Sequence, residues 1–339
     1  MNVKAALLKK AADPFAHLFW KAQINVLRAC PPLVGAIARF SMSADRSRGN
    51  WVKALLRVVV QAPRAAMLHW RDIKNKRVVL PRVSISLTTR CTLHCDKCMA
   101  HIPDLKSHKD IPLDDLAQDI RSLFSCVDYI YSLSLTGGEA FLHPALDEII
   151  RTCAAADKIG GMEVITNGTV VPDTKALAAL REAGVTVKIS GYPPALVPNA
   201  EKLKAVLKEN GIHYIHTDGT FWRDIVGRGF GRLEDGSETK RFGVCVQQLC
   251  VFLFYGKLHL CSESANLLEE ELIPDCKEDY IDLRKIDPAA FRGAWRQLMK
   301  KRAVSACSYC PGSTYKTPKV PVAIQRVPPG DPQREREVN

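Results

Sequence analysis

The sequence predicts a parallel α/β fold from residue 83 onward. Short apolar runs with strand-like alternation are followed repeatedly by longer stretches with helix-like apolar spacing. Strands and helices that alternate in this way form parallel sheets. The chain has 339 residues, of which 47% are apolar, enough for one large domain with appendages.

Each element is assigned from its own residues. Val83, Ile85 and Leu87 alternate with polar positions, as expected for a strand. Helices should begin near Pro112 and Pro172-Asp173, because both residue types favour the start of a helix. The expected strands are 83–88, 130–135, 162–166, 185–190 and 212–217, with a sixth near 250–254, and the expected helices are 112–126, 144–158, 173–183 and 198–210.

The net positive charge lies before this pattern. Residues 1–82 contain 16 Lys or Arg and 3 Asp or Glu, a balance of +13; the whole chain is +12, so residues 83–339 sum to −1. We expect a basic helical extension over residues 1–80. It could pack on the domain with a solvated basic face, dock on a partner, or lie through residues 1–75 on an anionic membrane surface. No nucleic-acid module is recognisable, so no nucleic-acid partner is expected.

The cysteine content indicates a reducing compartment. No secretory signal is visible, and no stretch approaches the roughly 18 uncharged apolar residues of a membrane span. Twelve cysteines in such a chain favour metal or redox chemistry over disulfides. The expected location is cytoplasmic, with peripheral contact at the inner face of the membrane if the extension binds lipid.

The most specific motif is C-x3-C-x2-C at Cys91, Cys95 and Cys98, just after the first expected strand. Three thiolates leave one iron of a [4Fe–4S] cluster without a protein ligand, and that iron can bind and reduce another molecule. A zinc site is the alternative. Zinc sites usually show four ligands in two pairs, and His94 could be the fourth only if one short turn supplied every ligand.

Three further motifs follow in order: Thr136-Gly137-Gly138-Glu139, Val164–Thr169 and Val187–Ser190. Together with the cysteines they resemble the radical S-adenosylmethionine (radical SAM) enzymes over about residues 80–315. In that family the GGE motif holds the amino group of the SAM methionine through its backbone and carboxylate, and the other two segments border the cofactor. The resemblance implies that SAM is bound by Gly137, Gly138, Glu139, Thr166, Asn167 and Ser190.

The resemblance also implies a fold and a chemistry. The fold is a partial (β/α)6 barrel whose strand carboxyl ends face the cofactor. Reduction of the cluster, by a partner such as flavodoxin or ferredoxin, cleaves SAM to a 5′-deoxyadenosyl radical that abstracts hydrogen from a substrate. The residue before the third cysteine is usually aromatic and packs near the adenine, whereas this chain has Lys97.

A second set of cysteines follows residue 240. Cys245 and Cys261 frame a predicted hairpin over 251–260, and Cys307 and Cys310 follow as C-x2-C. This order resembles the twitch region, a shortened SPASM domain, which holds an auxiliary [4Fe–4S] cluster. Cys250 is an alternative to Cys245, and structural zinc is an alternative to the cluster. The other cysteines show no partner spacing, and Cys30, Cys126 and Cys153 are interpreted as buried apolar residues.

The domain boundaries follow from these assignments. They are 1–80 for the extension, 81–240 for the barrel, 241–315 for the auxiliary-cluster region and 316–339 for a tail with little apolar periodicity, expected to be disordered. The connection 217–243 is expected to form loops over the active site.

Three hypotheses for function remain open. The first is hydrogen abstraction from a polyhydroxylated small molecule or glycan-related substrate, in a net oxidation or rearrangement. The second is a peptide-modifying maturase, and the third is an iron–sulfur electron-transfer or zinc protein without enzymatic activity. His216, Asp218 and Tyr192 are candidate catalytic residues, with Lys188 and Arg223 also near expected strand ends.

Overall fold

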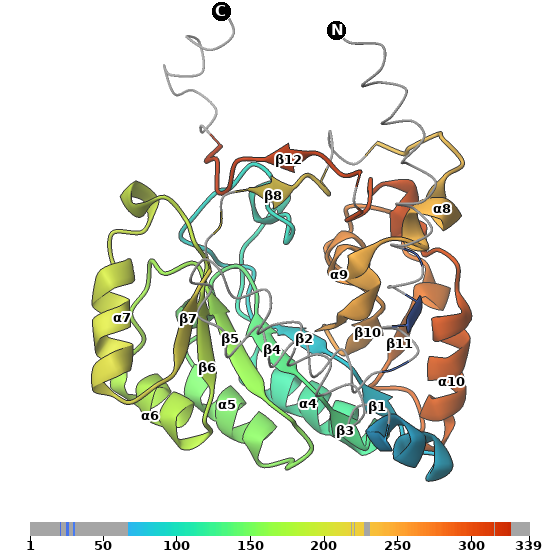
Figure 1. The fold of residues 1–339 in the computed structure, drawn as a ribbon, viewed down its shortest axis with the longest axis horizontal. Coiled ribbons are helices and arrows are strands. Elements are labelled where there is room, and N and C mark those ends of the chain that lie inside the picture. Colours follow the sequence, from blue (N-terminus) through green and yellow to red (C-terminus); the bar gives the residue numbers. More distant parts are fainter. Residues whose placement is uncertain are drawn as a thin grey trace, which may run out of the picture.

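The computed structural model describes residues 67–217, 219, 221–226, 231–314 and 316–326, together with the isolated residues 21, 25, 26 and 30. Most of the basic extension, and Asp218, therefore lie outside the described residues. Within the described part the chain forms one curved eight-stranded sheet in the order β11-β10-β9-β2-β4-β5-β6-β7 (Figure 1). The predicted α/β fold and partial barrel are confirmed.

The strands that pair in parallel lie close to their predicted positions. Pairing is parallel from β9 through β2, β4, β5 and β6 to β7, while β10 and β11 are antiparallel additions. The strands of this sheet are β2 (Val83–Ser86), β4 (Leu133–Thr136), β5 (Met162–Thr166), β6 (Thr186–Ile189), β7 (Tyr214–His216), β9 (Val251–Phe254), β10 (Lys257–His259) and β11 (Tyr280–Asp282). The predicted strand 130–135 is divided: β3 (Tyr129–Ile130) pairs with β1 (Val79–Leu80), and β4 begins three residues later.

Helices pack along the outer face of the sheet (Figure 1). In α4 the buried side chains of Leu116, Ile120 and Leu123 recur at helical spacing and join the main core cluster. The helices are α4 (Leu113–Cys126), α5 (Leu146–Ala154), α6 (Thr174–Glu182), α7 (Ala200–Glu209), α8 (Glu238–Phe242), α9 (Ser262–Glu269) and α10 (Pro288–Lys300), with a further helix over 67–74 and short 3-10 turns η1 (Ile102–Asp104), η2 (Ala140–Leu142), η3 (Pro194–Leu196), η4 (Val246–Leu249), η5 (Lys277–Asp279) and η6 (Ser305–Ser308).

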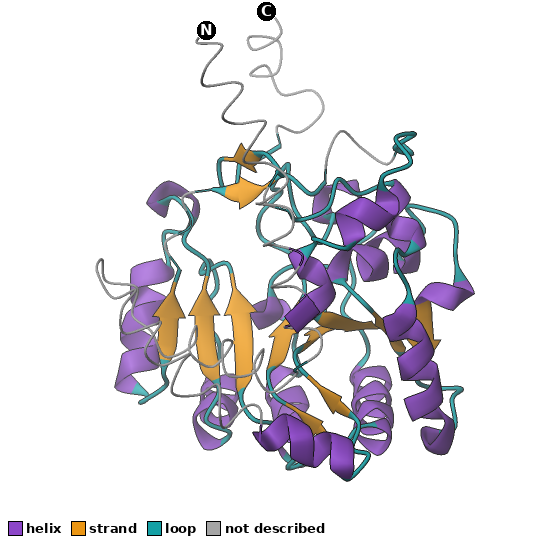
Figure 2. Ribbon diagram, turned by 45° about the vertical axis from the view of Figure 1, so that its right-hand side comes forward, coloured by secondary structure: helices purple, strands orange, loops and turns teal. Residues whose placement is uncertain are grey.

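A short two-stranded ribbon lies beyond the carboxyl ends of the parallel strands (Figure 2). It pairs β8 (Trp222–Arg223) with β12 (Lys319–Val320) in antiparallel register. Residues 316–339 were expected to be disordered; of these the structure describes 316–326, in which Lys319 and Val320 form this pair and Gln325 pairs with Cys95. Backbone hydrogen bonds, which leave no apolar pattern in the sequence, hold the segment in place.

Candidate functional site

A cavity of about 490 Å³ lies at the carboxyl ends of the parallel strands, where such folds bind their ligands. It brings together eight of the residues that the sequence analysis selected. Those that line it are Cys98, Gly137, Gly138, Thr166, Asn167, Ser190, Tyr192 and Arg223.

The loop with the first three cysteines holds each sulfur in a distinct environment. The Cys91 sulfur accepts hydrogen bonds from the Leu93 backbone N–H at 3.4 Å and the Asn167 amide at 3.6 Å. The Cys95 sulfur accepts one from the Gln325 amide at 3.3 Å. Burial raises the pKa of the Cys91 thiol to about 12 and that of Cys95 to about 11. These thiols must therefore release protons when they bind a metal centre.

The two glycines of the GGE motif lie against the start of this loop. A Cβ on Gly137 would stand 2.4 Å from the Thr88 carbonyl oxygen, and one on Gly138 would stand 2.2 Å from the Arg90 carbonyl oxygen. The close approach allows the Gly138 and Glu139 N–H groups to donate to those carbonyls, each at 2.8 Å. The motif needs glycine because backbone packs on backbone here.

Glu139 is fully buried and does not line the cavity. Its fully buried carboxylate accepts hydrogen bonds from the Thr166 hydroxyl (2.8 Å), the Asn167 N–H (2.7 Å) and the Phe141 N–H (3.0 Å). Burial raises the pKa of Glu139 to about 7 despite these donors. These hydrogen bonds join the GGE segment to the end of β5.

Aromatic side chains line the wall next to Lys97. The Tyr192 and Trp222 rings meet edge to face, with centroids 5.7 Å apart, and both line the cavity with Phe221. Lys97 itself pairs with Asp224 at 3.3 Å. The cavity therefore has an aromatic surface although Lys97 itself is not aromatic.

The remaining substrate-site candidates have different positions. His216 is exposed at the end of β7, Lys188 is half-buried in β6, and neither lines the cavity. Asp218 lies outside the described residues. Arg223 lines the cavity, but its guanidinium donates to the Thr314 carbonyl at 2.6 Å. Burial raises the pKa of the Tyr192 phenol, so this group stays protonated and is not a ready base.

The second cysteine set surrounds a separate, enclosed space of about 20 Å³. Cys245, Cys261, Cys307 and Cys310 all line it. Cys250 does not line this space. It immediately precedes β9, and its sulfur lies 3.2 Å from the Ser84 hydroxyl. The geometry thus groups Cys245, and not Cys250, with the other three.

Three sulfurs of this set also accept backbone hydrogen bonds. Ser313, Ser264 and Gly312 N–H groups donate to Cys245 (3.3 Å), Cys261 (3.4 Å) and Cys310 (3.2 Å), respectively. Donors of this kind stabilise thiolates and cluster sulfurs.

Cysteines elsewhere offer a contrast. Cys126 and Cys153 are buried in the apolar core as expected, and burial alone raises the pKa of Cys153 to about 12; Cys30 is only half-buried. Among the described residues no group of three or more His, Cys, Asp or Glu side chains is arranged to hold a single metal ion. A [4Fe–4S] cluster binds its cysteines on separate irons, and the buried thiols with N–H donors fit such a group.

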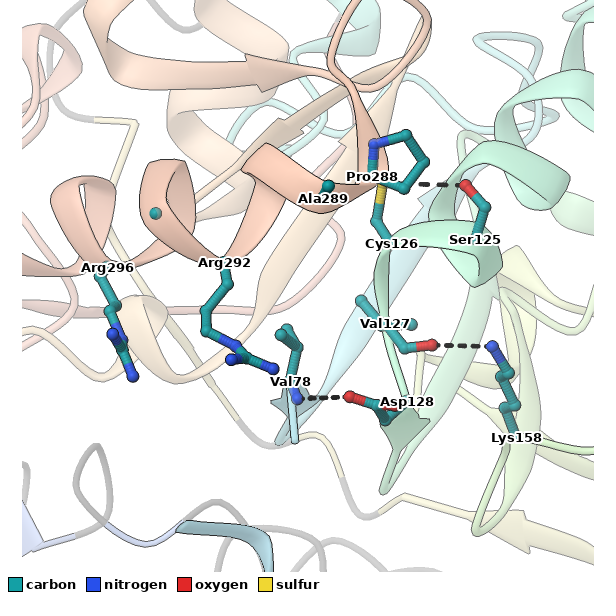
Figure 3. Close-up of a pocket in the computed structure, with 11 residues that line it drawn as sticks. Val78, Ser125, Cys126, Val127, Asp128, Lys158, Pro288, Ala289, Arg292 and Arg296 are labelled. Carbon is teal, nitrogen blue, oxygen red and sulfur yellow. Dashed lines mark hydrogen bonds between the residues drawn. The ribbon is translucent and has the colours of Figure 1, made fainter. Parts of the chain in front are cut away.

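A second large cavity, of about 450 Å³, lies at the other ends of the strands (Figure 3). Its wall includes Val78, Asp128 and Lys158, which precede β1, β3 and β5, respectively. Arg292 and Arg296 of α10 also line it. None of the motif residues reaches it.

Several site residues were missed by the sequence analysis. Trp222, Phe221 and Gln247 line the main cavity. Gln325 contacts the loop over residues 91–98, which carries the first three cysteines and is called the cluster loop below. Aromatic residues in the 217–243 connection were the only signal for the first two. Gln247 and Gln325 carry no motif, so only the fold reveals them.

Comparisons with known proteins agree with this geometry. Residues 85–192 match the profile of the Radical SAM superfamily. GTP 3',8-cyclase of Stenotrophomonas maltophilia (strain R551-3) is 34% identical over 107 residues, which are 31% of this chain and 32% of that protein. The enzyme of the same name from Aquifex aeolicus (strain VF5) is 32% identical over 118 residues, or 32% and 35% of the two chains. The chain thus spans about a third of the length of the curated relatives it matches.

Solved structures show weaker likeness. BtrN in complex with AdoMet and 2-DOIA is 16% identical with a TM-score of 0.42, covering 69% of this chain and 93% of that one. Streptococcus suis SuiB bound to its precursor peptide SuiA is 16% identical with a TM-score of 0.34, covering 51% and 39%. From the profile match and the motifs that line the cavity, we conclude that the chain contains a radical SAM domain, whose family cofactors are a [4Fe–4S] cluster and SAM.

Proposed function

We propose that this protein is an oxidising radical SAM enzyme that acts on a polyhydroxylated small molecule or a glycan-related substrate. Cys91, Cys95 and Cys98 would hold the cluster, and the cavity beside Cys98 would receive SAM and substrate together. The observation that carries the proposal is that one cavity has the SAM motifs on one wall and the second cysteine region on the other.

The cofactor contacts follow from the cavity wall. Gly137, Gly138, Asn167 and Ser190 line the cavity, and we propose that they bind the polar part of SAM. The Tyr192 and Trp222 rings offer an apolar surface for its adenine. When bound, the cluster and SAM supply a carbon-centred radical that removes hydrogen from the substrate; the protein orients both molecules and excludes water.

The lining offers hydrogen-bonding groups for a hydroxyl-rich substrate. The wall includes five hydroxyl or amide side chains beside those of the SAM motifs, among apolar and aromatic neighbours and the cationic Lys97 and Arg223: Ser86, Gln247, Ser262, Asn266 and Ser313. No Asp or Glu of the described chain lines the cavity. Hydroxyls and amides can each donate and accept hydrogen bonds, which suits a ligand with many hydroxyl groups.

The proximity of the second cysteine set to the main cavity supports a role in electron transfer. Gln247 lines both the main cavity and the cysteine-lined space, and Ser262, next to Cys261, faces the main cavity. After hydrogen removal a substrate alcohol must lose one electron and one proton to become a ketone. We propose that an auxiliary [4Fe–4S] cluster at Cys245, Cys261, Cys307 and Cys310 takes that electron. A flavodoxin- or ferredoxin-type partner would supply the electron that starts the cycle.

Iron content tests the two cofactor assignments. Anaerobically reconstituted protein should bind about eight irons, and replacing Cys91, Cys95 and Cys98 by Ala should remove about four and abolish 5′-deoxyadenosine formation with dithionite. Four irons with stoichiometric zinc in the unmodified protein would exclude the auxiliary cluster. Unchanged 5′-deoxyadenosine formation in the triple variant would exclude the radical SAM assignment.

The substrate class needs its own assay. We expect aminocyclitols, hexoses or UDP-sugars to raise 5′-deoxyadenosine formation at least about tenfold over the substrate-free rate. Ring-deuterated versions of the active compound should transfer deuterium into 5′-deoxyadenosine. Stimulation by a peptide library, with none by the hydroxylated compounds, would favour the maturase alternative.

A peripheral membrane contact is the second proposal. The helix over 67–74 exposes Met67, Trp70 and Ile73 at 62–63%, with Arg71 and Lys74 beside them. These positions follow a segment in which basic residues greatly outnumber acidic ones. Sedimentation with phosphatidylglycerol vesicles should be reduced by Trp70→Gln; equal sedimentation would contradict the proposal. No helix among the described residues is long and apolar enough to cross a bilayer.

A further inference from the structure

The segment after β12 crosses the cluster loop and pairs with it. The Asp96 N–H donates to the Ile324 carbonyl at 2.7 Å, and the Arg326 N–H donates to the His94 carbonyl at 2.8 Å. Ala323, only 1% exposed, packs with Leu93 and Cys95. We call residues 319–326 the C-terminal strap.

An ion-pair anchor holds the far end of the strap. The Arg326 guanidinium contacts the Asp96 carboxylate at 3.1 Å and the Asp104 carboxylate at 2.5 Å. Asp96 lies between the second and third cysteines, and Asp104 lies in the turn that follows them. The anchor therefore fixes the strap to both sides of Cys98.

Gln325 makes two contacts with the loop at once. Its side-chain oxygen accepts the His94 N–H at 2.9 Å, while its amide nitrogen donates to the Cys95 sulfur at 3.3 Å and to the Ala323 carbonyl at 2.7 Å. These bonds fix the orientation of the amide, so its N–H, and not its oxygen, faces the sulfur. Cys95 is 6% exposed, so water does not compete strongly for this contact.

We propose that Gln325 is a positioning residue that raises the reduction potential of the cluster at Cys91, Cys95 and Cys98. The inference rests on the cluster assignment in the proposed function. A hydrogen bond to a ligand sulfur withdraws negative charge and stabilises the reduced cluster more than the oxidised one, because the reduced cluster has one more electron. The strap thus makes the one-electron reduction that precedes SAM cleavage easier.

Two variants separate this effect from a purely structural one. Gln325→Met removes both side-chain contacts at similar volume, and Gln325→Glu keeps the acceptor for His94 but places a negative charge beside the sulfur. Ile324→Ala is the control, because that side chain is 48% exposed and only its backbone touches the loop. Potentials are measured by EPR-monitored titration with and without SAM, since SAM alters only the signal of the cluster with the open iron.

We expect Gln325→Met to disfavour reduction about tenfold, a shift of about 59 mV for one electron, and Gln325→Glu to disfavour it further. Ile324→Ala should match the unmodified protein. If both Gln325 variants have full iron content and an unshifted potential, the proposal is wrong, and Gln325 only supports the loop.

A second measurement does not depend on the cluster. In metal-free protein, iodoacetamide should modify Cys95 at least about tenfold faster in the double variant Gln325→Met, Arg326→Gln than in the unmodified chain, because the strap covers that thiol. Equal rates would show that the strap does not cover Cys95 and would overturn the inference. If instead the variant that lacks Cys91, Cys95 and Cys98 keeps all its iron, the proposed function is wrong. The alkylation rates still test whether the strap covers Cys95, because they are measured on metal-free protein.

Discussion

Replacing Gly138 by Ala should disrupt the cluster loop without touching a cysteine. The added Cβ would lie 2.2 Å from the Arg90 carbonyl oxygen and 3.0 Å from the Cys91 Cβ. The first is backbone, which cannot rotate away, so the two segments must separate. Separation weakens the Gly138–Thr88 and Glu139–Arg90 hydrogen bonds, both 2.8 Å long.

The expected cost follows from these contacts. Two hydrogen bonds at about 1 kcal/mol each, with about 1–3 kcal/mol for overpacking, give a loss of about 3–5 kcal/mol in the free energy of unfolding. Urea denaturation followed by circular dichroism measures the loss, and iron content after reconstitution reports the loop. A cluster held by Cys91 should fall in occupancy together with stability.

Gly293→Ala in α10 is the matched control. Its Cβ would meet nothing within 4 Å, and alanine favours helix, so this variant should be as stable as the unmodified protein or up to about 1 kcal/mol more stable. Gly138→Ala with an unchanged denaturation midpoint and unchanged iron content would refute the argument from backbone contact.

Three other predictions follow from described contacts. Cys245→Ser should remove about four irons and Cys250→Ser none, measured by iron assay, because only Cys245 lines the enclosed space; equal losses would contradict the grouping. Burial raises the pKa of Glu139 to about 7, so the unmodified protein should lose about 3 kcal/mol of stability, relative to Glu139→Gln, as pH rises from 4.5 to 7; parallel profiles would show that the folded-state pKa is not raised. Burial opposes ionisation of Asp279, but hydrogen bonds from Lys301 and Ser305 lower its pKa, so this carboxylate contributes stability that is lost as pH falls through its folded-state pKa. Lys301→Met should therefore cost about 1–3 kcal/mol at pH 7 and progressively less in acid, and a cost independent of pH would argue against the ion pair.

Local patterns were enough to predict most of the sheet and its helices. The alternation at 83–88 and the helical spacing at 112–126 each reflect one face packed on a common core, so each stretch of sequence contains its own evidence. The hairpin of β9 and β10 was predicted for the same reason, with its turn at Tyr255-Gly256. The order of the motifs correctly indicated that the cavity lies at the carboxyl ends of the parallel strands.

Contacts between distant segments could not be predicted in this way. The sequence left Cys245 and Cys250 as alternatives because both precede the hairpin; pairing of β9 with β2 brings Cys250 against Ser84 and excludes it from the cysteine-lined space. The buried Glu139 carboxylate is held by a hydrogen bond from Thr166 at the end of β5, 27 residues further along the chain. Phe221 and Trp222 line the cavity from a segment with no regular apolar pattern, so little in the sequence indicated them.

The strap also affects the order in which the protein can be assembled. Gln325 and Cys95 are 230 residues apart, and a chain made from its amino terminus exposes the cysteines long before Gln325 has been synthesised. Throughout that interval Cys95 lacks both its amide donor and the cover of Ala323. Iron delivery during synthesis would therefore find an accessible loop, and later docking of the strap would enclose a cluster already in place.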